Sequence, residues 1–450
     1  MDYAERLENV AVLGAAGKMG SGIVLLAGME LADLGLRPEN RSRTFVLHAV
    51  DVSHQALSGL MTYLQEQVRK AAEKRIVGLR AVYADRPDLI ENAEIVEQYV
   101  RDVLAIIRPA TVLDVAAEAR VVFEALPEDL DLKLRLLARA ATESPTRPWV
   151  FSNTSSIPIE EIDAKARLGG RIMGFHFYNP PAVQKLVELI KSRTTLPEVA
   201  EFAEALAKRL RKTVVLSRDH AGFIGNGHFM RDLLHAVAEV ERLGREMSHV
   251  EAVYTVNRVS QDFLIRPMGI FQLADYVGID VCQCIMRVMD ARLQGQHLHS
   301  ALVDRLLGLG VRGGQNFDGS QKDGFLRYEQ GKPAGVYDPD KAAYVPFTAV
   351  QAACDARLGA LPEPPLPWKV AVRHAAKDQA LAAFFGALRT MNTTGAELAK
   401  RYGARSRQIG LQLVHDGVAQ SPEDVNQVLL AGFFHAYGPI NDYFSETVTA

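Results

Sequence analysis

A loop with three glycines near the start of the chain constrains the fold more than any other feature. The loop, Gly14-Ala-Ala-Gly17-Lys-Met-Gly20, follows the short apolar run Val10–Leu13 and precedes a helical pattern over Ser21–Leu36. An apolar run rich in β-branched residues that ends at a glycine is typical of a buried strand. The chain is therefore expected to begin with a strand, a tight turn and a helix.

The same alternation of strand-like and helical patterns continues to about residue 217. A chain in which strands and helices alternate forms a mostly parallel sheet that helices cover on both faces. From Phe223 onward the pattern is mainly helical, which predicts an all-α region. The further strand-like runs are Thr44–Val50, Arg120–Ala125, Trp149–Phe151, Ile172–Phe177, Leu186–Ile190 and Thr213–Leu216.

A length of 450 residues suggests two to three domains. We expect domains over residues 1–217, 218–340 and 341–450. The stretch Arg266–Tyr276 resembles Ala436–Tyr443, and each follows a helical segment. The third domain is therefore a possible repeat of the second, although the spacing within the two stretches differs and chance is an alternative.

Composition excludes several classes of function. The chain is 48% apolar and 23% charged, with a formal net charge of −3, which gives no support for binding nucleic acid. It has no uncharged apolar stretch long enough to cross a bilayer and no basic start typical of a signal peptide. Three cysteines form neither a disulfide framework nor a metal site, so a cytoplasmic protein without a metal is expected.

The glycine loop fits the binding of a dinucleotide. Backbone N–H groups at a helix start bind a pyrophosphate, and glycines let the backbone approach it closely. Asp51, at the end of the second strand-like run, is expected to bind the ribose hydroxyls and to favour NAD over NADP; capping of the next helix is the alternative. The expected contacts in the loop are Gly14, Gly17, Lys18, Met19 and Gly20.

Four polar segments downstream of the loop fit the oxidation of an alcohol. A histidine removes the hydroxyl proton, a carboxylate orients the imidazole, and hydroxyl and amide groups position the substrate. Each segment alone is better explained as a turn, a cap or a solvated strand end. The segments are Ser152–Ser156, His176–Pro180, Lys185–Glu188 and Gly222–Asn226.

With these segments in place, the chain resembles the 3-hydroxyacyl-CoA dehydrogenase family from about Val10 to about Tyr328. The resemblance implies a Rossmann-like NAD-binding domain, a helical domain and an active site between them. It implies that Ser155, His176, Glu188 and Asn226 are catalytic, with Ser155 and Asn226 also contacting substrate. By the same matching, Glu128 and Lys133 contact NAD, and Lys74 contacts CoA; for Lys74 a solvated helix end is the alternative.

The expected reaction is the NAD-dependent oxidation of L-3-hydroxyacyl-CoA to 3-ketoacyl-CoA, with His176 as general base and Glu188 as its partner. Two alternatives remain at this point. The chain could oxidise a free hydroxy acid or sugar acid, because related dehydrogenases share the serine, histidine and glutamate. It could also be a non-catalytic NAD-binding scaffold subunit of a β-oxidation complex, although a scaffold has no need of the catalytic set.

The resemblance also bears on partners. Short relatives dimerise through the helical domain, and a duplicated helical domain could cover that surface within one chain. We therefore expect a monomer if the domain is duplicated and a homodimer otherwise. Association with an enoyl-CoA hydratase or a thiolase is a further expectation for a β-oxidation enzyme.

Overall fold

The computed structural model describes residues 2–316 and 319–445, and the chain divides into two compact units. The first unit comprises residues 1–220 and the second comprises residues 221–450. The end of the predicted third domain, residues 446–450, lies outside the described residues, as do residues 1 and 317–318. No helix in the described ranges is both long and apolar enough to cross a membrane.

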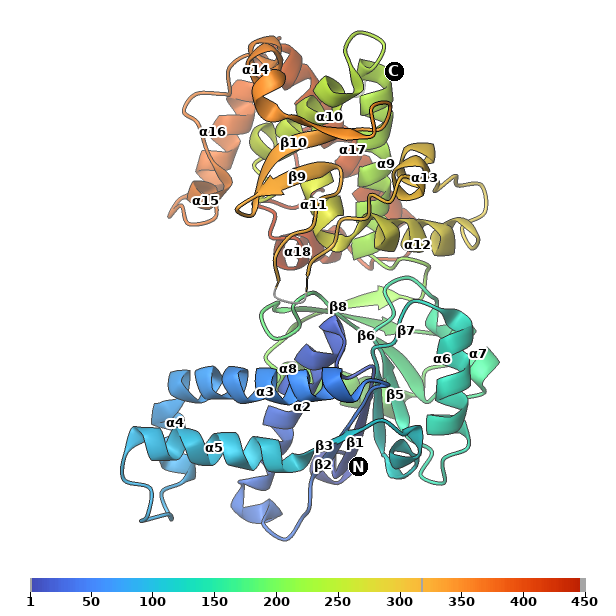
Figure 1. The fold of residues 1–450 in the computed structure, drawn as a ribbon, viewed down its shortest axis with the longest axis vertical. Coiled ribbons are helices and arrows are strands. Elements are labelled where there is room, and N and C mark those ends of the chain that lie inside the picture. Colours follow the sequence, from blue (N-terminus) through green and yellow to red (C-terminus); the bar gives the residue numbers. More distant parts are fainter. Residues whose placement is uncertain (1, 317–318, 446–450) are drawn as a thin grey trace. The chain divides into compact units, whose positions relative to one another are not determined.

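The described part of the first unit is built around an eight-stranded sheet (Figure 1). Its strand order is β3-β2-β1-β4-β5-β6-β7-β8, and every neighbouring pair is parallel except β6 and β7. The strands are β1 (Asn9–Leu13), β2 (Val46–Val50), β3 (Ile107–Ala110), β4 (Val121–Glu124), β5 (Trp149–Ser152), β6 (Ile172–Phe177), β7 (Leu186–Lys191) and β8 (Thr213–Arg218).

The predicted α/β architecture is confirmed, with two local differences. Strand β3 lies where the pattern predicted helix, at an edge of the sheet that tolerates Pro109 because an edge strand leaves one row of N–H groups unused. Strands β6 and β7 pair antiparallel, because the connection between them turns back directly without a helix.

Helices pack on this sheet through apolar faces. The buried residues of α3 recur every three to four positions, at Leu57, Leu60, Leu64 and Val68. This stripe packs against α5, and the two helices lie side by side in Figure 1. The helices of this unit are α1 (Tyr3–Arg6), α2 (Lys18–Gly35), α3 (His54–Lys74), α4 (Ile76–Val82), α5 (Asn92–Ile106), α6 (Leu130–Leu137), α7 (Ile159–Ala166) and α8 (Pro197–Arg209), with short turns η1 (Pro38–Asn40), η2 (Leu113–Glu118) and η3 (Ala138–Thr142).

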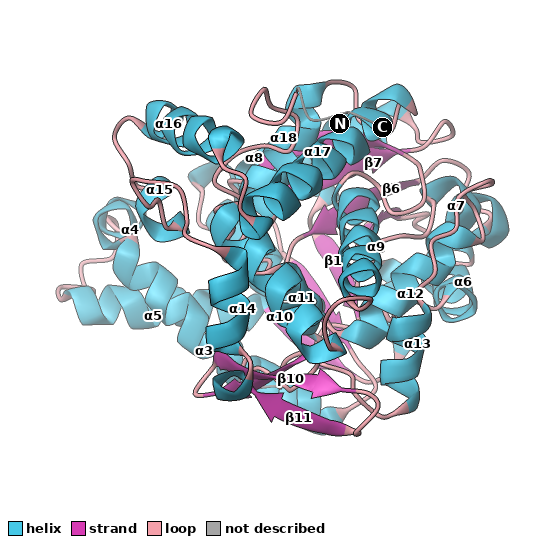
Figure 2. Ribbon diagram, turned by 90° about the horizontal axis from the view of Figure 1, so that it is seen from above, coloured by secondary structure: helices cyan, strands magenta, loops and turns pink. Residues whose placement is uncertain are grey.

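The second unit is mainly helical, as predicted, and contains in addition a small antiparallel sheet in the order β11-β10-β9 (Figure 2). Its strands are β9 (Leu326–Glu329), β10 (Lys332–Asp338) and β11 (Ala343–Pro346). Its helices are α9 (Gly225–Leu243), α10 (His249–Arg258), α11 (Ile270–Val277), α12 (Ile279–Asp290), α13 (Ala301–Gly308), α14 (Gln351–Leu358), α15 (Trp368–Ala371), α16 (Lys377–Thr390), α17 (Thr394–His415) and α18 (Pro422–Gly432), with turns η4 (Val259–Phe263) and η5 (Phe347–Ala349).

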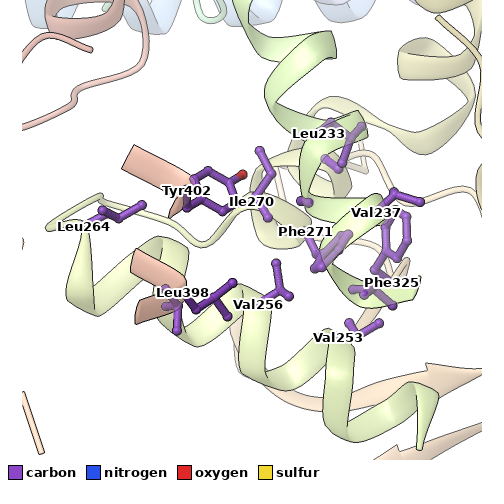
Figure 3. Packing of buried hydrophobic residues seen from close by; sticks show 14 of the residues in the cluster. Leu233, Val237, Val253, Val256, Leu264, Ile270, Phe271, Phe325, Leu398 and Tyr402 are labelled. Atoms are coloured by element: carbon purple, nitrogen blue, oxygen red, sulfur yellow. The ribbon is translucent and has the colours of Figure 1, made fainter. Parts of the chain in front are cut away.

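One hydrophobic core joins the early and late parts of the second unit (Figure 3). Phe271 of α11 packs against Phe325, with ring centroids 4.7 Å apart. Leu398 and Tyr402 of α17 belong to the same core as Leu233 of α9, and α9 packs directly on α17. Residues after 340 are therefore part of the same folded unit as residues 221–340.

Two pairs of consecutive helices in this unit have the same local design. Helix α10 follows α9 and begins at a capping box made by Ser248 and Glu251. Helix α18 follows α17 and begins at a capping box made by Ser421 and Asp424. Reciprocal caps of this kind satisfy the N–H groups at a helix start.

Candidate active site

The glycine loop joins β1 to α2 and requires glycine at two positions. Gly14 has φ +76°, and a Cβ atom there would lie 2.5 Å from the carbonyl oxygen of Ala125. A Cβ atom at Gly20 would lie 2.0 Å from the Gly14 carbonyl oxygen, so α2 could not approach the strand so closely. Both glycines therefore allow the tight strand–turn–helix packing that a dinucleotide fold uses.

The start of α2 has the features of an anion site. Gly17 is the N-cap of α2, and among the described residues no side chain caps this helix. Its first turn holds Lys18 and Met19 and no acidic residue. Backbone N–H groups and a positive dipole at such a helix start favour a phosphate, so the residues present fit NAD here.

Asp51 directly follows β2 and contacts the glycine loop. One of its carboxylate oxygens, Oδ2, accepts a hydrogen bond from the backbone N–H of Ala16 at 3.0 Å. The next helix, α3, is capped by Ser53, whose hydroxyl accepts a hydrogen bond from the backbone N–H of Ala56. Asp51 therefore does not cap α3, and its position beside the loop fits the expected ribose contact.

His176 and Glu188 occupy paired positions on neighbouring strands. The antiparallel register of β6 and β7 places these two residues directly opposite each other. His176 Nδ1 lies 3.3 Å from Glu188 Oε1, and Glu188 is fully buried while His176 is 6% exposed. A buried carboxylate in this position fixes the orientation of the imidazole.

Tyr178 adds a second contact to the same carboxylate oxygen. Its hydroxyl donates a hydrogen bond to Glu188 Oε1 at 2.5 Å. Burial, together with the adjacent charge of Glu188, raises the pKa of Tyr178 well above its ordinary value. The phenol therefore stays protonated and acts as a donor at any working pH.

Glu128 holds the segment that contains Ser155. Its Oε1 atom accepts hydrogen bonds from the backbone N–H of Ser155 at 3.0 Å and from the Ser155 hydroxyl at 3.2 Å. The side chains of Thr154 and Ser156 donate to the same oxygen, each at 2.8 Å. Burial raises the pKa of Glu128, but Lys133 and these hydrogen bonds outweigh it, so the net pKa is lowered and the side chain is a carboxylate.

Lys133 lies against two carboxylates in the interior. Its ammonium donates to Glu124 Oε1 at 2.6 Å and lies 3.4 Å from Glu128 Oε2. The Lys133 side chain is 1% exposed. Burial lowers the pKa of Lys133, but the two carboxylates raise it by more than burial lowers it, so Lys133 stays charged. These contacts orient Glu128, and the predicted contact of Lys133 with NAD stays a prediction.

The two remaining predicted residues lie elsewhere. Asn226 is the second residue of α9, in the second unit. Lys74 is the last residue of α3 and is exposed. The first unit therefore holds Ser155, His176 and Glu188, while the roles of Asn226 and Lys74 stay predictions.

Sequence reasoning missed three residues of this region. Tyr178 and Glu124 lie in the stretches that resemble the family, but nothing in the sequence indicated their contacts. Lys212 gave no signal: its ammonium donates to the carbonyl oxygens of Pro181 and Gln184 in the connection between β6 and β7. Burial lowers the pKa of Lys212 to about 8.

Comparison with known proteins identifies the family of this chain. Residues 9–220 match the family model for the NAD binding domain of 3-hydroxyacyl-CoA dehydrogenase, and residues 222–323 match the model for its C-terminal domain. A probable 3-hydroxybutyryl-CoA dehydrogenase of Bacillus subtilis is 32% identical over 288 residues, which cover 64% of this chain and 87% of that protein. The mitochondrial hydroxyacyl-coenzyme A dehydrogenase of Homo sapiens is 29% identical, covering 62% of this chain and 79% of that protein.

Solved structures share the fold. FadB2 of M. tuberculosis matches with a TM-score of 0.54 and 26% identity, covering 72% of this chain and 99% of that chain. A 3-hydroxybutyryl-CoA dehydrogenase of Escherichia coli K12 matches with a TM-score of 0.62 and 22% identity, and covers 96% of this chain and 90% of that chain. The two family models and the Bacillus subtilis relative show that the chain belongs to the 3-hydroxyacyl-CoA dehydrogenase family and is an NAD-dependent enzyme.

Proposed function

We propose that the protein oxidises the 3-hydroxyl group of an L-3-hydroxyacyl-CoA thioester to a 3-keto group. One observation carries this proposal: His176 and Glu188 lie 3.3 Å apart on paired strands, in a setting that is almost fully buried. A carboxylate at one ring nitrogen orients the imidazole, so that the histidine can act as a general base toward a substrate hydroxyl.

In this proposal, His176 and Glu188 together remove the proton of the substrate hydroxyl. His176 Nε2 accepts the proton of the 3-hydroxyl, and Glu188 balances the positive charge that forms on the ring. The bond between carbon 3 and its hydrogen breaks as the carbonyl forms. When bound, NAD supplies the acceptor for the hydride that leaves this carbon.

Ser155 positions the reacting oxygen in this proposal. Its own position is fixed because Glu128 accepts hydrogen bonds from both its backbone N–H and its hydroxyl. Asn226 would bind the carbonyl side of the substrate, and Lys74 would bind the CoA part. Their replacement by alanine and methionine, respectively, is expected to raise KM for the thioester more than KM for NAD.

The residues for NAD follow from the loop. Backbone groups at Gly17, Lys18 and Met19 would hold the pyrophosphate, and Asp51 would bind the ribose hydroxyls. Asp51→Ala is therefore expected to weaken NAD binding and to narrow the preference for NAD over NADP. Fluorescence titration with each dinucleotide measures both effects.

The test of the proposed function is the formation of NADH, followed by absorbance, with NAD and a panel of 3-hydroxyacyl-CoA thioesters of increasing length. Free 3-hydroxy acids and sugar acids serve as controls. Turnover of thioesters alone is the expected result, and the panel identifies the preferred chain length. Turnover of the free acids alone, or NAD binding with no turnover of any compound, would refute the proposal.

We further propose that α17 and α18 are a second copy of α9 and α10. Both pairs have a Ser capping box at the second helix, and α9 packs on α17 within one core. Such internal pairing predicts a monomer, whether or not a hydratase or thiolase associates with it. Light scattering after size exclusion tests this, and a dimer that buries residues 222–330 against their own copy would contradict it.

A further inference from the structure

Tyr178 and His176 both contact the same carboxylate oxygen of Glu188. Tyr178 follows β6 by one residue, and its hydroxyl lies 2.5 Å from Glu188 Oε1, while His176 Nδ1 lies 3.3 Å from that oxygen. The rings of Tyr178 and His176 are 4.9 Å apart between centroids, with planes inclined at 48°. One carboxylate oxygen therefore serves two aromatic side chains that flank the same point of the strand.

We infer that Tyr178 is a positioning residue, which acts on the reaction through Glu188. This inference rests on the proposed function, because it assigns Tyr178 a role in the same proton transfer. A hydroxyl that donates to a carboxylate oxygen fixes the rotamer of the glutamate and withdraws part of its negative charge. Tyr178 thereby limits how strongly Glu188 attracts a proton onto His176.

Two charged residues of this region have other partners. Lys212 lies 5.8 Å from the ring centroid of Phe177 and donates to backbone carbonyls of the loop after β6. Glu128 is bound to the segment around Ser155 and to Lys133. Burial, together with the charge of Glu188, raises the pKa of Tyr178.

Removal of the hydroxyl has two expected consequences. Without its donor, the Glu188 carboxylate carries more negative charge and holds the protonated form of His176 more strongly. The acidic limb of the pH profile of kcat/KM therefore moves to higher pH. The glutamate also loses a contact that holds its rotamer, so the imidazole is less well oriented and kcat falls on the alkaline plateau.

The experiment is Tyr178→Phe, which keeps the ring and removes the hydroxyl. We expect kcat on the plateau to fall roughly tenfold, in line with the loss of one charge-assisted hydrogen bond. We expect the acidic limb to move up by about half a pH unit or more. KM for the thioester and the affinity for NAD are expected to stay within about twofold, since the hydroxyl contacts neither in this proposal.

Two further variants make the test specific. Tyr83→Phe is the matched control, because the Tyr83 hydroxyl also donates to a carboxylate oxygen, Asp102 Oδ2, at 2.5 Å. Tyr83 is the C-cap residue of α4 and contacts none of the proposed catalytic residues through this bond. This control variant is expected to leave the pH profile unchanged. In a Glu188→Gln background the Tyr178 hydroxyl has no carboxylate charge to act on, so Tyr178→Phe is expected to lower kcat less than in the wild type.

The outcomes separate this inference from the proposed function. If the wild-type enzyme oxidises the thioesters but Tyr178→Phe has a normal kcat and a normal acidic limb, Tyr178 is not a positioning residue, and the proposed function stands. If Tyr178→Phe lowers kcat equally in the wild-type and Glu188→Gln backgrounds, the hydroxyl does not act through Glu188. If the wild-type enzyme turns over no thioester, the proposed function itself fails, and this inference fails with it.

Discussion

Two buried carboxylates, one in each unit, each accept a hydrogen bond from a tyrosine but differ in their other partner. In the second unit, Asp232 accepts hydrogen bonds from Arg266 at 2.7 Å and from the Tyr402 hydroxyl at 3.2 Å. In the first unit, Glu188 accepts a hydrogen bond from a tyrosine and faces His176. Both carboxylates pair with a tyrosine, but the third member is a permanent cation in one case and a titratable ring in the other.

We interpret the carboxylate beside the arginine as structural and the carboxylate beside the histidine as part of the proposed active site. Burial raises the pKa of Asp232, but Arg266 outweighs this effect, so the net pKa is lowered and the pair stays ionised. A carboxylate with a permanent cation has a constant charge and links the elements that hold it, here α9, the segment before α11, and α17. Glu188 instead faces His176, and the proposed oxidation assigns the transfer of a proton to this histidine.

The largest expected effect is on the titratable member of the first cluster. His176→Gln keeps a polar side chain of similar size but cannot act as a base at neutral pH. We expect kcat to fall by about 10²–10⁴. NAD affinity, measured by titration of the purified variant, is expected to stay unchanged, and normal turnover in this variant would refute the role of His176.

Breaking the ion pair of the second cluster is expected to cost stability. Arg266→Met leaves Asp232 as an unpaired buried charge, for which the typical cost is about 3–5 kcal/mol. Chemical unfolding followed by circular dichroism measures the loss in the transition of the second unit. An unchanged midpoint would mean that the pair contributes nothing to this unit.

Acid is expected to weaken the same region. His228 lies beside this cluster, its Nε2 atom lies 3.1 Å from the Ser406 carbonyl oxygen, and burial lowers its pKa to about 4. The unfolded chain takes up a proton near pH 6.5 and the folded chain near 4, so stability is present above pH 6.5 and is lost as the pH falls toward 4. The loss is of the order of 3 kcal/mol.

The substitution that tests this is His228→Gln. This variant is expected to lose less stability than the wild type between pH 6.5 and 4, because its side chain does not titrate. Unfolding midpoints at a series of pH values measure the difference. Parallel pH curves for the two proteins would show that another group causes the acid sensitivity.

The smallest effect is expected at an exposed ion pair of the same unit. Arg305 lies 2.7 Å from Asp340, and their side chains are 50% and 75% exposed. Arg305→Met is expected to cost less than about 1 kcal/mol, because water screens the pair. It is the matched control for Arg266→Met, and an equal loss in both variants would remove the distinction between buried and exposed pairs.

The sequence predicted the parts of the fold that local patterns encode. The strands at Ile172–Phe177 and Leu186–Lys191 are mostly apolar. The polar residues His176 and Glu188 were noticeable within them for this reason. The sequence did not predict β10, because Lys332–Asp338 contains proline, glycine and charged residues that are atypical of a strand. Such a strand forms because its partners on both sides and the core beneath it supply the stabilisation.

Contacts between distant residues were the main gap. The pairing of Asp232 with Arg266 and Tyr402 joins residues up to 170 positions apart, and no spacing rule connects them. The bond from Tyr178 to Glu188 depends on the antiparallel return of β7, which the sequence pattern did not distinguish from a parallel crossover. The sequence therefore predicted which residues belong to the candidate site, but it did not predict their hydrogen-bond partners.

The most direct test compares Glu188→Gln with Asp232→Asn. For each variant, the measurement is kcat per folded molecule together with the midpoint of chemical unfolding. We expect Glu188→Gln to keep its midpoint and lose most of its turnover, and Asp232→Asn to lose stability and keep its turnover per folded molecule. Normal turnover in Glu188→Gln, or a loss of turnover per folded molecule in Asp232→Asn as large as that in Glu188→Gln, would contradict it.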